Sequence, residues 1–158
     1  MVSTLVNEID PPRAGLVGID DLVGYLTGEW ALSRALVDFA GASRGRFEGR
    51  ARFELDTDGS LAYREEGELT FDGYRGRATR AYRYLPTGTG EADVCFGDGR
   101  PFFHLDLRTG CASARHRCGE DTYVGLHLAR GSDCFETRWR VLGPQKALLL
   151  ATTAHRRR

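Results

Sequence analysis

Apolar and polar residues alternate with a period of two from Gly28 almost to the end of the chain, and turn-forming residues interrupt this alternation roughly every ten residues. The interruptions include "DTDGS", "FDGY", "GDGR", "RTG", "CGED" and "RGSD". A period of two is typical of strands that bury one face. The pattern predicts about ten strands, at 29–39, 45–56, 60–71, 74–85, 91–97, 101–108, 111–118, 121–129, 134–142 and 146–155.

The residues before the first strand have a different pattern. Within Asp20–Gly28, apolar residues such as Leu22 and Leu26 have helical spacing, behind an aspartate that can cap a helix and ahead of a glycine that can end it. Residues 1–18 have no such pattern. We therefore expect a flexible N-terminal lead at 1–18 and a single domain at 19–158.

Short links between the predicted strands favour a meander, because strands that are consecutive in sequence usually pair. A long meander exposes two sheet edges, and closure into a barrel removes both. The sequence thus predicts an all-β fold: a closed antiparallel meander β-barrel of about ten strands with a short N-terminal helix.

The segment "FDGY" contains Asp72-Gly73, the strongest short signal for a two-residue hairpin turn. Counting outward from this turn in steps of two places Glu65 opposite Arg80 and Tyr63 opposite Tyr82 on the inner face. The preceding loop at 57–59 gives the same inner face. A buried carboxylate and guanidinium framed by tyrosines are candidate ligand-binding groups.

Small residues lie beside this pair: Gly49, Ala51, Gly67, Gly76 and Ala78. A core filled for stability alone would carry larger aliphatic residues at such positions. We therefore expect a wet cavity with a polar anchor. The alternative is a half-exposed cross-strand pair at the barrel mouth.

A second polar cluster surrounds the turn Gly119-Glu120, which sets His116 opposite Tyr123. Because imidazole titrates near neutrality, this pair is a candidate for catalytic proton transfer. The alternative is a core histidine hydrogen-bonded to a tyrosine. On a later strand Trp139 alternates inward with Thr137 and Val141, which is typical of barrel core and occasionally of a ligand wall, so Trp139 is also a ligand-binding candidate.

The face of the sheet on which His104 lies depends on the turn that follows its strand. With Thr109-Gly110 as a two-residue turn, His104 and Asp106 face solvent. With a three-residue loop at 108–110, both join His116 inside, and His104 becomes a ligand-binding candidate.

A metal site would need the second arrangement, with His104, Asp106, His116 and Cys118 as ligands. Their spacing matches no common zinc pattern. Haem bound through His116 is disfavoured by the surrounding charges. We therefore predict no metal and no cofactor.

Composition and charge narrow the classes of partner that the protein can have. The formal net charge is zero, so no basic surface for nucleic acid is indicated. No apolar run has the ~18 residues that span a membrane, and the first twenty residues do not resemble a secretory signal. The four cysteines form no C-x-x-C pair. We expect a cytoplasmic protein, monomeric or homodimeric, without nucleic-acid or membrane partners.

The helix leads into "GEW" (Gly28-Glu29-Trp30), and the chain ends in a strand followed by Arg156–Arg158. This resembles the lipocalin and calycin superfamily, in which a G-x-W closes one end of the barrel and an arginine beyond the last strand packs on the tryptophan. Segments such as "DGRPFFHLDL" and "WRVLGPQKALLLATT" also resemble an uncharacterised bacterial family of small lipocalin-like barrels. The resemblance implies the fold and assigns no catalytic residue.

Three functions fit these features. The first is a barrel that binds a small molecule in a polar internal pocket. The second is a cofactor-free isomerase, cyclase or lyase of bacterial metabolism that uses the same pocket. The third is a structural or interaction protein with a filled barrel.

Overall fold

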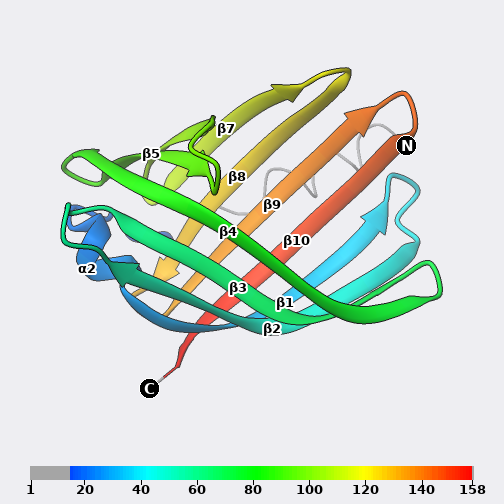
Figure 1. Cartoon of the computed structure of the whole chain (residues 1–158), viewed down its shortest axis with the longest axis horizontal. Coiled ribbons are helices and arrows are strands. Elements are labelled where there is room, and N and C mark those ends of the chain that lie inside the picture. The colour runs from blue at the N-terminus through cyan, green and yellow to red at the C-terminus, as the bar shows by residue number, and fades with distance from the viewer. Residues whose placement is uncertain (1–14, 158) are drawn as a thin grey trace.

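The computed structural model describes residues 15–157, which form one short helix and a single ten-stranded antiparallel sheet (Figure 1). The elements are α2 (Leu22–Leu26), β1 (Gly28–Asp38), β2 (Ser43–Leu55), β3 (Leu61–Phe71), β4 (Tyr74–Gly88), β5 (Glu91–Phe96), β6 (Pro101–Asp106), β7 (Cys111–Cys118), β8 (Asp121–Gly131), β9 (Cys134–Gly143) and β10 (Lys146–Arg157). All the predicted elements are present, with ends displaced by up to a few residues. Among these residues, no helix is long and apolar enough to cross a bilayer.

The strands form a nearly closed barrel. Their order is β6-β5-β4-β3-β2-β1-β10-β9-β8-β7, so consecutive strands pair and β1 also pairs with β10. The predicted meander barrel is therefore confirmed. The one open seam lies between β6 and β7, which end the order and share no ladder of hydrogen bonds.

The chain before α2 crosses this seam. The amide of Ile19 donates to the carbonyl of Leu107 at 2.9 Å, and the amide of Val17 donates to the carbonyl of Ala129 at 3.0 Å. These bonds join the end of β6 to β8 across the gap. Most of the expected lead at 1–18 lies outside the described residues.

The hairpin between β3 and β4 has the predicted geometry. Asp72 and Gly73 both have positive φ, 47° and 85°, as a two-residue turn that matches the twist of the strands requires. Glu65 pairs with Arg80 and Tyr63 with Tyr82.

One end of the barrel is closed by Trp30, which is fully buried, beneath α2. Its indole nitrogen donates to the carbonyl of Leu26 at 2.9 Å. The Arg156 guanidinium lies 4.3 Å from the centre of its ring and donates to the carbonyl of Thr27 at 3.0 Å. The prediction that a terminal arginine covers Trp30 is confirmed, and Arg156 is that residue.

Candidate functional site

The barrel encloses a cavity of about 570 Å³. Leu26 and Leu107 line it near the end that α2 closes. The hairpin of β5 and β6 is short, six residues in each strand against fifteen in β4, so the wall is low on this side (Figure 1). The lining includes the exposed Arg100 and the half-exposed Arg80, which mark the mouth.

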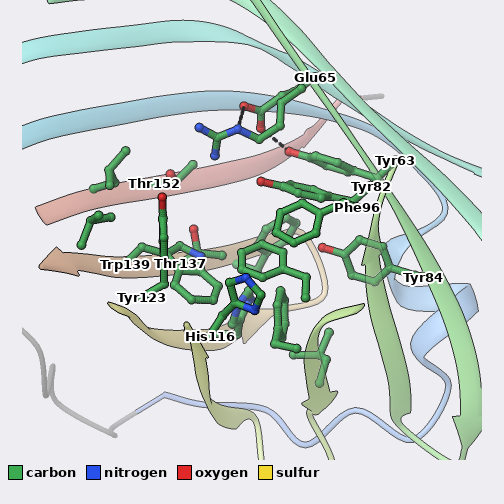
Figure 2. Close-up of a pocket in the computed structure, with 18 of the residues that line it drawn as sticks. Tyr63, Glu65, Tyr82, Tyr84, Phe96, His116, Tyr123, Thr137, Trp139 and Thr152 are labelled. Atoms are coloured by element: carbon green, nitrogen blue, oxygen red, sulfur yellow. Dashed lines mark hydrogen bonds and ion pairs between the residues drawn. The ribbon is translucent and has the colours of Figure 1, made fainter. Parts of the chain in front are cut away.

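Aromatic rings form a large part of the cavity wall (Figure 2). Phe102 stacks between Phe96 and Trp139, with ring centres 4.5 and 5.2 Å away. Tyr63 stacks on Tyr82 at 5.8 Å, and the Tyr82 ring lies 5.4 Å from Phe102, so these rings form one continuous series. The candidates Tyr63, Tyr82 and Trp139 therefore all line the cavity.

Glu65 also lines the cavity and is 3 % exposed, but its main partner is not Arg80. Arg34 of β1 binds both carboxylate oxygens of Glu65, at 2.8 and 3.0 Å. The hydroxyl of Tyr63 donates to the same carboxylate. The Arg80 Nε lies 3.7 Å from Glu65, and its side chain is 43 % exposed. The predicted pairing of Glu65 and Arg80 is thus correct as strand register, and the strong ion pair is with Arg34.

This arrangement fixes the charges of the pair. Burial raises the pKa of Glu65, but hydrogen bonds and attraction from Arg34 outweigh it, and the pKa lies below its usual value. Burial lowers the pKa of Arg34, and Glu65 reverses this effect to leave a net increase. Both groups are ionised at neutral pH, so the interior pair is electrically neutral as a unit.

The small residues near this pair do not leave space for a ligand. None of the five lines the main cavity; Ala78 lines a separate pocket of about 90 Å³ behind the ion pair. The ring of Phe47 occupies the space over Gly49 and Gly67, and a Cβ on either would lie 2.8 Å from it. Arg34 in turn rests on the Phe47 ring at 5.0 Å. The glycines therefore make room for Phe47, and the Phe47 ring packs against the Arg34 guanidinium that binds Glu65.

Sequence reasoning did not single out Arg34, although its position carries a signal. It shares the inward phase of β1 with Trp30, Leu32 and Leu36, all of which are buried. A charge in the middle of such an apolar series indicates a buried partner, because an unpaired buried charge is very costly.

The candidate catalytic residues His116 and Tyr123 both line the cavity and pair across β7 and β8. Their ring centres are 6.1 Å apart. His116 presents its ring to Phe96 and Phe102, at 5.4 and 5.1 Å. No hydrogen bond joins His116 to any residue of 15–157, so neither a tyrosine nor a carboxylate orients its imidazole.

A second histidine of the cavity, His127, was not among the candidates. It is buried, stacks on Phe103 at 4.9 Å and meets Trp139 edge-on at 5.6 Å. Within the described chain its Nε2 has no hydrogen-bond partner. Burial lowers the pKa of His127 to about 4, so it is neutral at physiological pH. His127 lies four residues after Tyr123 on β8, so the period of two places both side chains on the inner face, and this could have identified it.

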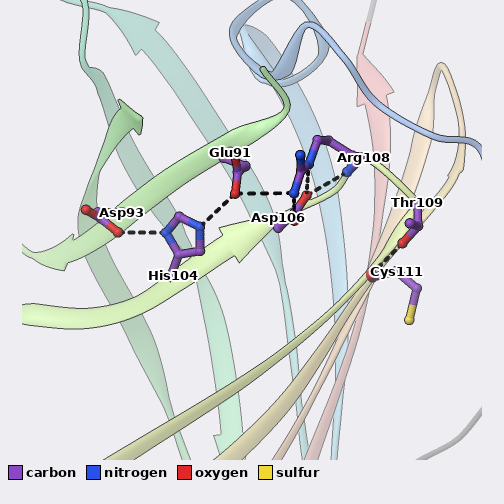
Figure 3. Close-up of polar contacts among 7 residues, drawn as sticks. All are labelled: Glu91, Asp93, His104, Asp106, Arg108, Thr109 and Cys111. Carbon is purple, nitrogen blue, oxygen red and sulfur yellow. Dashed lines mark hydrogen bonds and ion pairs between the residues drawn. The ribbon is translucent and has the colours of Figure 1, made fainter. Parts of the chain in front are cut away.

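His104 lies on the outer face of the barrel (Figure 3). Its ring nitrogens contact Asp93 at 2.7 Å and Glu91 at 3.3 Å, and hydrogen bonds with these carboxylates raise its pKa. Leu105 and Leu107 are buried instead. The orientation is that of the two-residue alternative, so His104 does not line the cavity and is no longer a ligand-binding candidate.

The described residues hold no group of three or more His, Cys, Asp or Glu side chains that could bind a metal ion. Asp106, which a metal site would have needed, instead binds Arg108 on the outer face, and this interaction lowers its pKa to about 2 (Figure 3). The four cysteines are free thiols.

Comparison with known proteins identifies a family. Residues 26–157, which include all ten strands of the barrel, match the model of a family of unknown function, DUF6314. The chain belongs to this family. The match agrees with the resemblance to an uncharacterised family that the sequence showed, in that both point to a family of unknown function. No curated protein matches the DUF6314 chain in sequence.

Solved structures resemble the barrel in shape. An S-type phycobiliprotein lyase, CPES from Guillardia theta, superposes with a TM-score of 0.63 at 9% identity, covering 91% of this chain and 95% of that one. EF1p2_mFAP2b bound to DFHBI superposes with a TM-score of 0.50 at 10% identity, covering 88% and 99%. At such identities the likeness shows the fold, which also occurs in proteins that hold small ligands.

Proposed function

We propose that this barrel binds a small, largely apolar molecule in its internal cavity. The cavity itself carries the proposal: its volume of about 570 Å³ falls within the range of about 300–1,000 Å³ that is usual for ligand sites. A barrel that served only as a scaffold would fill this space with side chains.

The distribution of polar groups supports the same proposal. Ligand pockets are mostly apolar and carry a few polar groups that fix orientation. Here the hydroxyls of Tyr123 and Thr137 line the cavity and make no hydrogen bond to another described residue. They are available to a ligand, whereas Glu65 and Arg34 are already paired with each other.

Binding fits the cavity better than proton-transfer catalysis. A general base needs a partner that orients it and a substrate proton within reach. His116 is surrounded by rings and has no orienting hydrogen bond within the described chain. The solved ligand-bound barrel and the lyase named above are consistent with binding on this fold, and fold alone does not transfer their activities.

The test is binding of the neutral fluorescent probe N-phenyl-1-naphthylamine, which suits an aromatic cavity. The expected result is one site per chain and a higher melting temperature, by about 5–10 °C at a probe concentration of about 100 times Kd. Thr137→Trp, which fills the cavity from β9, should abolish binding. Leu142→Trp on the outer face of the same strand is the matched control and should bind normally. Failure of the parent protein to bind this probe, or any cavity-sized apolar molecule, would refute the proposal.

A further inference from the structure

The charge on the cavity lining is unbalanced. Four arginines line it, namely Arg34, Arg80, Arg100 and Arg117, against a single carboxylate, Glu65. The chain as a whole has a formal net charge of zero, so this excess is local. Charges gathered at one cleft raise the local concentration of ligands of opposite sign.

The partners of these arginines locate the excess at the mouth. Arg34 and Glu65 neutralise each other inside. Arg100 is bound to Asp98 at 2.7 Å. Arg80 interacts with the uncharged hydroxyl of Tyr82, and the carboxylate nearest to it is the already neutralised Glu65 at 3.7 Å. For Arg117, residues 15–157 supply no ion-pair partner.

Arg80 and Arg117 come from different parts of the barrel. Arg80 lies on β4 and Arg117 near the end of β7, on either side of the short β5–β6 hairpin. Both side chains are accessible to solvent and both line the one cavity. A group at the mouth would therefore meet two guanidinium ions whose charges residues 15–157 leave largely uncompensated.

We propose that the ligand of this cavity is an amphipathic anion, with a flat apolar body among the aromatic rings and a carboxylate, sulfonate or phosphate group at Arg80 and Arg117. This inference rests on the proposed binding function and specifies its ligand class. Guanidinium ions bind such oxyanions through charge-assisted, often bidentate hydrogen bonds. A cationic ligand would meet repulsion at the same mouth.

Two probes with the same ring system separate charge from shape. 8-Anilino-1-naphthalenesulfonate carries a sulfonate, and N-phenyl-1-naphthylamine does not. The sulfonate probe should bind at least about tenfold more tightly, the factor expected for a charged contact. Its affinity should fall as salt is added, since the mouth is exposed.

Substitutions at the mouth complete the test. Arg80→Gln and Arg117→Gln should each weaken binding of the sulfonate probe by up to about tenfold and leave the neutral probe within about twofold. Arg77→Gln is the matched control, because Arg77 lies on the same strand as Arg80 with an outward, 81 % exposed side chain. Thr137→Trp should remove the sulfonate probe from its single site, which excludes binding elsewhere on the surface.

The outcomes distinguish the two proposals. Equal affinities for the two probes, with no effect of either arginine substitution, would overturn the anionic ligand class and leave the binding function standing. Absence of binding by both probes would overturn the binding function, and the ligand class with it. Unchanged melting temperatures for the glutamine variants show that each result comes from the mouth and not from loss of the fold.

Discussion

The buried pair of Arg34 and Glu65 gives the sharpest test of the interior. Removing one member of a buried ion pair costs about 3–5 kcal/mol, because the other charge is left without compensation. Glu65→Leu leaves Arg34 with only the hydroxyl of Thr152, which accepts from its Nε at 2.7 Å, and the ring of Phe47. This variant should therefore lose close to 5 kcal/mol of unfolding free energy.

Arg34→Met should cost less, close to 3 kcal/mol. Glu65 retains the Tyr63 hydroxyl, and Arg80 lies near enough at 3.7 Å to move toward it. The double variant should be more stable than either single variant, since two apolar side chains then replace two charges. Arg80→Met alone should cost about 0–1 kcal/mol because its side chain is half exposed.

Urea denaturation followed by far-UV circular dichroism measures all four free energies. Arg46→Met is the control, since its ion pair with Glu48 is exposed and should contribute at most about 1 kcal/mol. Additive losses in the double variant would show that Arg34 and Glu65 are not coupled. A double variant of Glu65→Leu and Arg80→Met gives the coupling of that pair, and a larger coupling of Glu65 to Arg80 than to Arg34 would show that the wrong arginine has been assigned.

Three further predictions concern stability. Trp30→Ala should lower the free energy of unfolding in urea by about 3–5 kcal/mol, and Arg156→Met should lower it less because the indole stays buried. A Trp30→Ala variant as stable as the parent protein would contradict the burial of Trp30 at the closed end of the barrel. Because the pKa of His127 is about 4 when folded and 6.5 in a model compound, the unfolded chain takes up a proton first as pH falls. Stability should drop by about 3 kcal/mol between pH 7 and 4 on this account, and His127→Phe, compared by thermal unfolding, should lose that part of the pH dependence. Gly67→Ala should force apart the backbones of β2 and β3 at Glu48 and Gly49, displace the Phe47 ring, and cost at least about 1 kcal/mol, whereas a neutral result would contradict this close packing.

The sequence predicts the parts of this fold that depend on chain connectivity. Asp72-Gly73 permits a single two-residue turn, and this turn sets every pair along β3 and β4, including Glu65 with Arg80. The turn at Gly119-Glu120 likewise sets His116 opposite Tyr123. The sequence does not decide which face of β6 is buried, because two turn lengths fit residues 108–110. In the structure β6 and β7 do not pair, so no ladder register relates His104 to His116.

The partner of Glu65 could not be predicted in the same way, because side-chain reach decides it. On the inner face Arg34 lies in the row of Phe47, and Glu65 lies in the row of Ala51, with the row of Gly49 and Gly67 between them. Strand register alone assigns Glu65 to its direct neighbour. The Arg34 side chain can span the intervening row because glycines occupy it, and the Phe47 ring lies over these glycines and beneath the Arg34 guanidinium.

The same geometry explains why the cavity lies beside the ion pair and not over the glycines. Phe47 and Arg34 occupy the space that small residues leave on β2 and β3. The ion pair of Arg34 and Glu65 lies between the main cavity and the pocket of about 90 Å³, and lines both. Since Arg34 neutralises Glu65, Arg80 is released from its predicted role as an internal partner. Arg80 keeps a half-exposed side chain at the mouth of the cavity, so the two residues that the strand register pairs differ in environment: Glu65 is held inside by Arg34, and Arg80 is accessible from solvent.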